Sequence, residues 1–499
     1  MTIPDDKPTT YESLRLPGYY GYLVVAGLYQ TSRKLPSPLS TAYFLPALKH
    51  CIDTHPILSA AIQGADTESP QFVRPSHLHL KRHVRVVDVR ESADEEKVIR
   101  NAIVECHDRF THGGDLIPPW DVTVMPLPRH PKSDGTKLCV LFSYSHSHGD
   151  GTAGLSFHHS FLRGLRQHAG TAQTDGASAY EPPDYPLLPA FATAVNLKIS
   201  WSYLLGALFA DRLPTFLRTA LGLPSLSAVT EDTWLGRPIT HDPAHHHTGL
   251  ETLVLANADV KGLLSACRAH DVRLTGLLHQ LIVRVLSQSL PECCKIDGPA
   301  PPAYDIVATT PLSIRHLAPG WASVTDMVMA VSATQELFPA GVNAAISDSA
   351  DDALWSGSRE TGAKLAAASS TLTDQPIGLL RYVSDVRSWL TDQLGNPRDC
   401  SYELSNIMMF DPEEAGPQEV AAELTGGGWE VGNMYFSQPA NVVGPPLTFS
   451  VVSRKGGALV VCLSWQVGVL GVKDESAFAT EVLASVESQI AEMIRGKGY

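Results

Sequence analysis

The chain has 499 residues, with 38 basic and 52 acidic side chains and a formal net charge of −14 at pH 7. A single hydrophobic core stops growing at roughly 250–300 residues, so this length predicts at least two domains. Nucleic acid is excluded as the main partner, because neutralising phosphates requires clustered lysine and arginine and the sequence contains no such cluster. The apolar share of 44% is ordinary for a globular enzyme.

Residues 1–17 are polar and lack the apolar run of a signal peptide. The most apolar stretch, 199–210, is shorter than the about 20 residues that a bilayer crossing needs, so we expect no transmembrane segment. We interpret this stretch as a core or interdomain helix rather than a membrane-surface helix. The eight cysteines show no paired spacing, and several lie in apolar runs, which indicates buried free thiols in a cytoplasmic protein.

In the first half, strand and helix patterns alternate along the chain. Apolar or alternating runs predict strands, and a 3.6-residue periodicity predicts helices. The expected strands are 20–26, 82–89, 121–127 and 137–145, and the expected helices are 41–51, 95–110 and 155–165. The last two strands form a hairpin, because a polar, turn-rich segment joins them. Residues 169–189 have the composition of a connector, and 190–221 have a largely helical pattern.

A second unit of similar make-up follows a proline-containing linker at 223–248. Its expected strands are 250–256, 304–310, 324–331, 401–410, 447–453 and 458–465, and its expected helices begin near 257, 275 and 478. No repeat of 20–50 residues occurs. The sequence therefore predicts two mixed α/β domains, 1–222 and 249–499.

One short motif points to chemistry. Residues 146–151 read His-Ser-His-Gly-Asp-Gly, which fits the pattern H-x-x-x-D-G. A second match at 130–135 lies in the hairpin connection, where Asp-Gly is a turn signal. His146 instead follows a buried-type strand and precedes an amphipathic helix, where a rigid scaffold presents a loop side chain.

The residue types of this motif suit proton transfer. A neutral imidazole with a pKa near its ordinary ~6.5 is the usual general base at neutral pH, and an alcohol that attacks a thioester must lose its proton. Asp150 can cap the following helix or pair with an arginine and so fix the loop. Gly151 permits a tight turn and close approach of other atoms.

The hexapeptide, its place about a third of the way along the chain, and Ser405-Asn406 in a late strand resemble the BAHD-type and fungal alcohol O-acyltransferases. These are relatives of chloramphenicol acetyltransferase and of nonribosomal peptide condensation domains. The resemblance implies two chloramphenicol acetyltransferase-like α/β domains that form a V-shaped pseudo-dimer with a tunnel at their interface. It also implies that His146 is the general base and that Asp150 pairs with an arginine of the second domain, for which Arg315 is the best match. Ser405 or Asn406 would assist the oxyanion.

The chain departs from the plant BAHD enzymes in one motif. It lacks their D-F-G-W-G, of which Gly428 to Gly432 is a faint echo, so the fungal or bacterial branches are the better match. The residues that bind coenzyme A stay unassigned. Arg381, Arg454 and Lys455 are candidates for the basic rim that a polyanionic donor requires on an acidic protein.

We therefore expect a cytoplasmic acyltransferase that moves an acyl group, most simply acetyl, from acyl-CoA to a hydroxyl of a hydrophobic metabolite, without a metal or a bound cofactor. One alternative is a condensation-like scaffold used for cyclisation, pericyclic or carrier-protein-dependent chemistry. Another is a metallo-β-lactamase-like hydrolase, suggested by His146-x-His148-x-Asp150, although Gly151 stands where that pattern has a further histidine.

Overall fold

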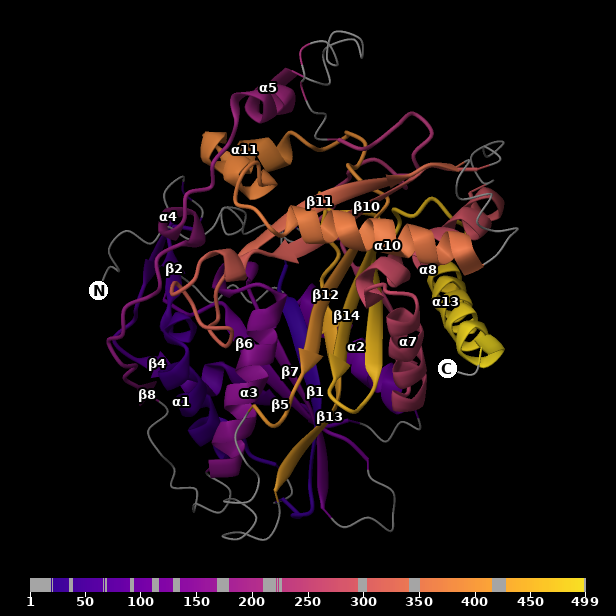
Figure 1. The fold of residues 1–499 in the computed structure, drawn as a ribbon. Helices are drawn as coiled ribbons and strands as arrows, with labels where there is room; N and C mark the ends of the chain where they lie inside the picture. Colours follow the sequence, from indigo (N-terminus) through magenta and orange to yellow (C-terminus); the bar gives the residue numbers. More distant parts are fainter. Residues whose placement is uncertain are drawn as a thin grey trace.

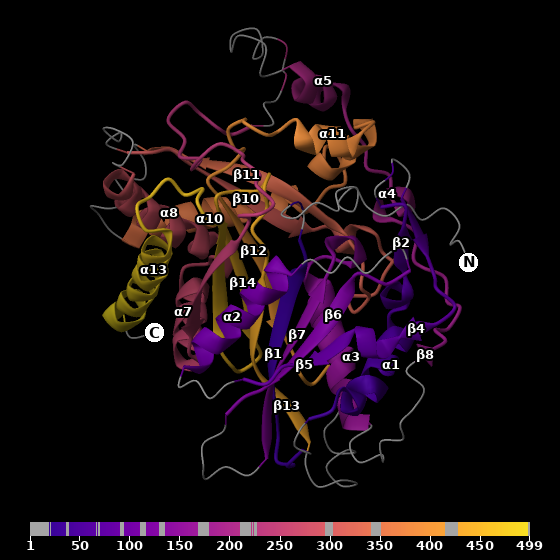
Figure 2. The same ribbon diagram turned by 180° about the vertical axis from the view of Figure 1, so that it is seen from behind.

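Two β-sheets form the centre of the molecule, and helices cover them on the outside, as Figures 1 and 2 show from opposite sides. The structure is a computed structural model. It describes residues 19, 21–35, 39–65, 67, 70–89, 94–109, 116–128, 135–167, 179–209, 221, 223, 227–294, 303–340, 351–414 and 428–497.

The first sheet has the strand order β13-β1-β7-β6-β5. Its strands are β1 (Leu23–Thr31), β5 (Val84–Val86), β6 (Trp120–Pro126), β7 (Thr136–Tyr144) and β13 (Trp429–Ser437). β6 and β7 pair antiparallel, which confirms the predicted hairpin. Four short strands form two separate pairs, β2 (Ala61–Gln63) with β3 (Gln71–Val73) and β4 (Leu78–His79) with β8 (Ala179–Tyr180).

Helices of the first half lie around this sheet, and the three longest of them each bury an apolar face in the core that includes it. They are η2 (Thr41–Phe44), α1 (Leu45–Thr54), η3 (Pro56–Ser59), η4 (Leu80–Arg82), α2 (Glu95–Asp108), η5 (His146–His148) and α3 (Gly151–Gln167). The side chain of Asp94 caps α2 by accepting the backbone N–H of Lys97. α3, the helix that follows the H-x-x-x-D-G motif, packs against α1 and against β1.

The second sheet has the order β11-β10-β12-β14-β15-β9. Its strands are β9 (Thr248–Leu255), β10 (Ile306–Ser313), β11 (Val331–Phe338), β12 (Tyr402–Phe410), β14 (Leu447–Arg454) and β15 (Leu459–Gln466). Side chains alternate between its faces. Leu404 belongs to the core beneath the helices of the second half, whereas Ile407 belongs to the core of the first half. One face of this sheet therefore forms the contact between the halves.

The remaining helices are α4 (Phe191–Ala194), α5 (Trp201–Phe209), α7 (Asn257–Ala269), α8 (Leu274–Cys293), η8 (Arg315–Leu317), α10 (Asp351–Ala368), η9 (Pro376–Tyr382), α11 (Val386–Thr391) and α13 (Glu475–Lys497). Among them, α7, α8, α10 and α13 contribute to the core of the second half. Neither α10 nor β13 was expected from the sequence. Within the described residues, no helix combines the length and apolarity that a bilayer-spanning segment requires.

Strand β13 connects the two halves. It belongs by sequence to the predicted domain 249–499, yet it pairs with β1 in the first sheet, with Val24 opposite Ser437. In Figure 1 it is the orange strand beside the indigo and purple strands. The division at 222 and 249 stays a prediction, but the second half of the chain supplies one strand of the first sheet.

Two expectations about local structure are wrong. Of the two alternatives for the apolar stretch 199–210, the core helix is wrong: α5 lies at the periphery above α11 (Figure 1), and Trp201 is 77% exposed. Residues 324–330 are not a strand, because their backbone groups bond to Arg315 and Asp150 instead of to a neighbouring strand. By contrast, all eight cysteines are free and six are buried, as expected.

Candidate functional site

The H-x-x-x-D-G residues form the turn between β7 and α3. Ser145 caps the short helix η5, its side chain accepting the backbone N–H of Ser147. His146 to His148 make that single turn, and α3 begins at Gly151. The strand, turn and helix expected from the sequence are therefore present, and they hold His146 at one end of the first sheet.

His146 is partly buried in this turn. Burial lowers the pKa of its imidazole below the usual 6.5, while hydrogen bonding to the backbone of His146 and Gly149 and the negative charge of Asp150 act in the opposite direction. The imidazole is therefore neutral at pH 7, which is the form that accepts a proton.

His148 has a structural role. One ring nitrogen contacts the Ser147 hydroxyl at 2.9 Å, and the other donates to the backbone oxygen of Ala60 at 2.8 Å. Burial lowers its pKa to about 4. Because both nitrogens are engaged, His148 has no nitrogen free to act as a metal ligand beside His146, and the metallohydrolase alternative gains no support from this geometry. Among the described residues, no cluster of three or more His, Cys, Asp or Glu side chains is arranged to hold a metal ion.

Asp150 connects the turn to the second half. Its Oδ1 accepts the Thr152 backbone N–H at 3.1 Å and the Thr152 hydroxyl at 2.6 Å. Its Oδ2 accepts the backbone N–H of Ala330 at 3.3 Å, and its own N–H donates to the oxygen of Val328 at 3.1 Å. The carboxylate is 1% exposed, so these bonds replace its lost hydration.

Arg315 reaches Asp150 from the second half. Its Nη2 lies 3.6 Å from Asp150 Oδ2 and 3.3 Å from the Thr152 hydroxyl. Its Nη1 donates to the backbone oxygens of Ser323, Val324 and Asp326 at 3.0–3.1 Å. The structure thus brings together the pair that the resemblance implies. It also adds a function that the sequence did not suggest, because the same guanidinium holds the loop 323–326.

Gly151 lies where the halves touch. A Cβ atom at this position would lie 2.4 Å from Cγ2 of Ile407 on β12 and 3.1 Å from Cζ of Phe436 on β13. Both distances are shorter than ordinary contacts, so only glycine fits without displacement. The helix α3 can therefore begin directly against the second half.

Ser405 and Asn406 point to opposite faces of β12. Ser405 is 8% exposed and lies, like Ile407, on the face toward the first half. The Asn406 side chain instead donates to the hydroxyl of Thr275 on α8 at 3.3 Å and accepts the backbone N–H of Met408 at 2.9 Å. Of the two, Ser405 lies on the face toward the half that carries His146.

Glu403 lies on the same face as Ser405, and sequence analysis missed it. Its Oε1 accepts the Gln438 side-chain N–H at 2.7 Å. Gln438 directly follows β13. The last residues of β13 and of β7 lie at the same end of the first sheet, because both pair with the start of β1. Burial raises the pKa of this carboxyl group to about 7. The only sequence signal was a single acidic residue among apolar neighbours in a strand.

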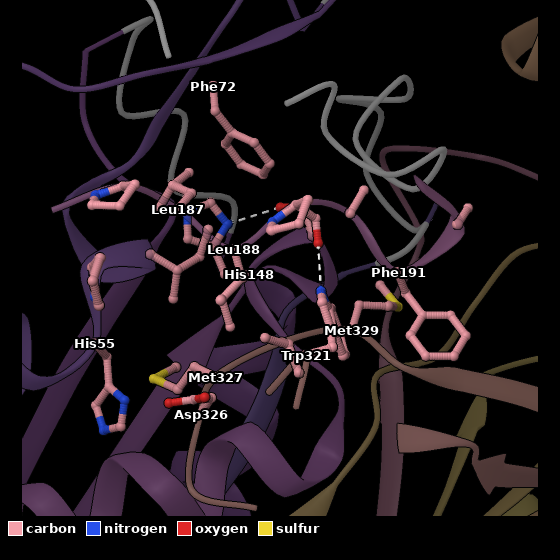
Figure 3. A pocket seen from close by; sticks show the side chains of 18 of the residues that line it. His55, Phe72, His148, Leu187, Leu188, Phe191, Trp321, Asp326, Met327 and Met329 are labelled. Atoms are coloured by element: carbon pink, nitrogen blue, oxygen red, sulfur yellow. Dashed lines mark hydrogen bonds between the residues drawn. The ribbon is translucent and has the colours of Figure 1, made fainter. Parts of the chain in front are cut away.

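A cavity of about 700 Å³ lies between the halves, beside the turn. Ser147 and His148 line it, together with side chains from three further regions: 54–57 and Phe72, the segment 186–197, and residues 321–329 with 377–381. In Figure 3, Phe72 approaches from one side and His55, Asp326 and Met327 lie on the opposite side. The resemblance implies a tunnel at the interface, but no local pattern indicates which residues line this cavity, because its walls come from distant segments.

The candidate cations for a CoA rim already have partners. Arg381 donates to the backbone oxygens of Gly378 and Leu197. Arg454 donates to the oxygens of Val431 and Lys455, and Lys455 pairs with Asp411 at 2.6 Å. The other motif match, at 130–135, lies outside the described residues except for Gly135.

Known proteins are similar to this chain over most of its length. A probable alcohol acetyltransferase of Aspergillus fumigatus, crmB, is 24% identical over 436 residues, which cover 83% of this chain and 84% of that protein. A second one, FCK4 of Fusarium pseudograminearum, is 23% identical over 435 residues, covering 84% of this chain and 82% of its own.

Among solved structures, the TRI3 trichothecene 15-O-acetyltransferase from Fusarium sporotrichioides superposes with a TM-score of 0.64 at 12% identity, over 97% of this chain and 94% of that one. The epimerization domain from the third module of tyrocidine synthetase B gives a TM-score of 0.55 at 13% identity, over 96% and 92% of the two chains. These likenesses confirm the predicted chloramphenicol acetyltransferase-like fold. The alcohol acetyltransferase family profile matches residues 87–487. Because this match spans most of its length, the chain belongs to the alcohol acetyltransferase family and is an enzyme that transfers an acyl group to an alcohol.

Proposed function

We propose that this enzyme transfers an acyl group, most simply acetyl, from acyl-CoA to a hydroxyl group of a hydrophobic metabolite, with His146 as the general base. One observation carries the proposal: the turn that holds His146 is fixed from the second half through Asp150 and Arg315. The names of the relatives support the reaction type, since two are probable alcohol acetyltransferases and a solved one acetylates an oxygen of a trichothecene.

In the mechanism that follows, the neutral imidazole of His146 takes the hydroxyl proton while the alcohol oxygen attacks the thioester carbonyl carbon. A C–O bond forms, and the carbonyl oxygen becomes an oxyanion, for which Ser405 is our candidate hydrogen-bond donor. When the C=O bond reforms, the C–S bond breaks and the leaving thiolate receives the proton from the imidazolium. The acyl group moves directly, without an acyl-enzyme.

The cysteines support direct transfer. Burial raises the pKa of the Cys106 and Cys267 thiols to about 11, so both are protonated at pH 7 and are poor nucleophiles. We propose acyl-CoA as a co-substrate rather than a bound cofactor. We also propose the cytoplasm as the location, because it keeps thiols reduced.

The test is thiol release from acetyl-CoA in the presence of a metabolite extract that contains alcohols, followed by detection of the ester. Substituting His146→Ala should leave the fold intact and lower the rate by roughly 10²–10⁴, the usual contribution of a general base. The matched control is His245→Ala, since the His245 side chain is 81% exposed in the linker and pairs with Asp242. Retained activity of the His146 variant would refute the mechanism.

The same assay separates the alternatives. Transfer from a carrier-protein thioester but not from acetyl-CoA would indicate carrier-dependent chemistry. A product that forms without thiol release and carries no added acyl group would indicate cyclisation. Burial lowers the pKa of His146 below 6.5. The transfer rate should therefore begin to decline only when the pH is lowered below 6.5, where the imidazole becomes protonated.

A further inference from the structure

Glu403 presents a carboxyl group to the contact between the two halves. It lies on β12, where residues 403, 405 and 407 share the face toward the first half, and Ile407 belongs to the core of that half. The Glu403 side chain is half-buried. The catalytic steps assigned to His146 and Ser405 leave this carboxyl group without a role.

One oxygen of the carboxyl group is held and the other is open. Oε1 accepts the side-chain N–H of Gln438 at 2.7 Å, and the backbone oxygen of Gln438 accepts the Ser464 hydroxyl at 2.8 Å. Within the described residues, no hydrogen bond reaches Oε2, and this atom is not one of the buried atoms that lack a partner. Oε2 is therefore accessible to a small molecule. Because Oε1 accepts, Oε2 is the oxygen that carries the proton in the neutral form.

The carboxyl group lies near the turn that carries His146. Ser437 on β13 and Ser143 on β7 pair with the same residue of β1. Gln438, which holds Glu403, follows Ser437 directly. His146 comes three residues after Ser143. Because neighbouring strands are about 5 Å apart, β13 and β7 lie about 10 Å apart on either side of β1, so a reacting carbonyl between them can be reached from both sides.

The surroundings keep the Glu403 carboxyl group largely neutral up to pH 7. Burial raises its pKa to about 7, the hydrogen bond to its Oε1 acts in the opposite direction, and the negative charge of Asp399 raises it further. Its neighbours in register, Thr309 and Thr448, are uncharged. His107, which bonds to the last residue of β13, is neutral as well, because burial lowers its pKa to about 4. A neutral carboxyl group donates a hydrogen bond, whereas a carboxylate only accepts.

We propose that Glu403 donates a hydrogen bond from Oε2 to the oxyanion that forms when the alcohol attacks the thioester, beside Ser405. This inference rests on the proposed function. The carboxyl group keeps its proton throughout, and no bond to it forms or breaks. Residues 403 and 405 lie about 7 Å apart along the strand, so the longer side chain and the short hydroxyl can approach one oxygen. Donors already aimed at the developing charge lower the barrier, and a carboxylic acid kept neutral in an apolar site can be such a donor.

The test is the pH profile of acetyl transfer to 1-octanol or, if this alcohol is not accepted, to the metabolite extract. Thiol release from acetyl-CoA gives kcat and KM between pH 6.5 and pH 9 for the wild type, Glu403→Gln and Glu403→Ala. The control is Glu96→Gln, which changes another half-buried carboxyl group, on α2 and bonded to the Tyr435 hydroxyl. Thermal melts check that each variant is folded.

In the wild type, kcat should fall about tenfold for each pH unit above about 7, because the carboxylate cannot donate and repels the oxyanion. Glu403→Gln has an amide N–H in place of the hydroxyl, so its kcat should stay constant over this range. Glu403→Ala should lose about 10²–10³ in kcat at pH 6.5, the usual effect of removing one oxyanion donor, with little change in KM. Glu96→Gln should keep the wild-type profile.

An alkaline decline that Glu403→Gln retains would overturn the inference. So would an effect of Glu403→Ala that is confined to the KM for the alcohol, because Glu403 would then bind the acceptor and not the oxyanion. With an active wild type, either result leaves the proposed function standing. A wild type that releases no thiol with 1-octanol or with the extract would instead refute the proposed function, and this inference with it.

Discussion

Replacing Arg315 by alanine should lower stability and activity together. The substitution removes three hydrogen bonds to backbone oxygens of 323–326, one to Thr152, and the countercharge of Asp150, whose carboxylate is 1% exposed. Breaking a buried ion pair by removing one partner costs about 3–5 kcal/mol. Asp150 keeps its bonds to Thr152 and Ala330, so we expect the lower half of that range. For a chain of this length the unfolding entropy is about 1 kcal/mol per degree, so Tm should fall by about 3–4 °C.

The activity of this variant should fall by about 10²-fold, since losing the contacts of Arg315 displaces the turn of His146 by about an ångström. Arg315→Lys should rescue little, because one ammonium group cannot bond to three carbonyl oxygens and to Thr152 at once. Calorimetric melting and thiol release measure the two effects. The control is Arg359→Ala, which removes one exposed hydrogen bond to the backbone oxygen of His270 and should cost about 0.5–1.5 kcal/mol. An unchanged Tm and rate for Arg315→Ala would refute the reasoning.

Two further substitutions test the contact between the halves. Gly151→Ala forces a Cβ atom to 2.4 Å from Ile407 and should lower the free energy of unfolding in urea by about 1–3 kcal/mol. The control Gly362→Ala lies within α10, where a Cβ atom would meet nothing within 4 Å, and should raise that free energy by about 1 kcal/mol. Equal effects of the two substitutions would contradict the close contact. Glu403→Gln keeps an acceptor for Gln438 but removes a carboxyl group whose pKa burial raises from 4.5 to about 7. A raised carboxyl pKa weakens the fold as pH rises from about 4.5 through 7, so this variant should be more stable than wild type by about 2–3 kcal/mol at pH 8 and equal to it at pH 4. A gain that is the same at both values would show that the carboxyl group does not titrate as described.

The parts of the fold that local patterns determine were predictable. A polar connection between two apolar runs gave the β6–β7 hairpin, and the change from strand to helix periodicity around His146 placed the turn correctly. Arg315 was reached through the resemblance and not through any local pattern. Its role at the carbonyl oxygens of 323–326 had no sequence signal, because those partners are backbone atoms.

The parts that depend on long-range pairing were not predictable. Residues 324–330 have strand-like composition, but a side chain from η8 and another from the first half take their backbone groups, and tertiary contacts override propensity. β13 pairs with β1 some 400 residues away, as the partners Val24 and Ser437 show. The apolar pattern of α5 predicts a core or interdomain helix, and it cannot exclude an exposed position, because hydropathy measures a side chain's preference and not the space available to it.

The turn of His146 therefore depends on the contact between the halves as much as on its own residues. On one side, Gly151 allows α3 to begin against β12 and β13, both from the second half of the chain. On the other side, Asp150 is held by Ala330, Val328 and Arg315, again from the second half. A base that must meet a hydroxyl group within hydrogen-bond reach tolerates little displacement. Because both sets of contacts come from the second half, a substitution that weakens the packing between the halves moves His146, even when the substituted residue lies far from the turn. Residues of the contact, including Ile407 and Phe436, are therefore expected to affect the rate without touching a substrate.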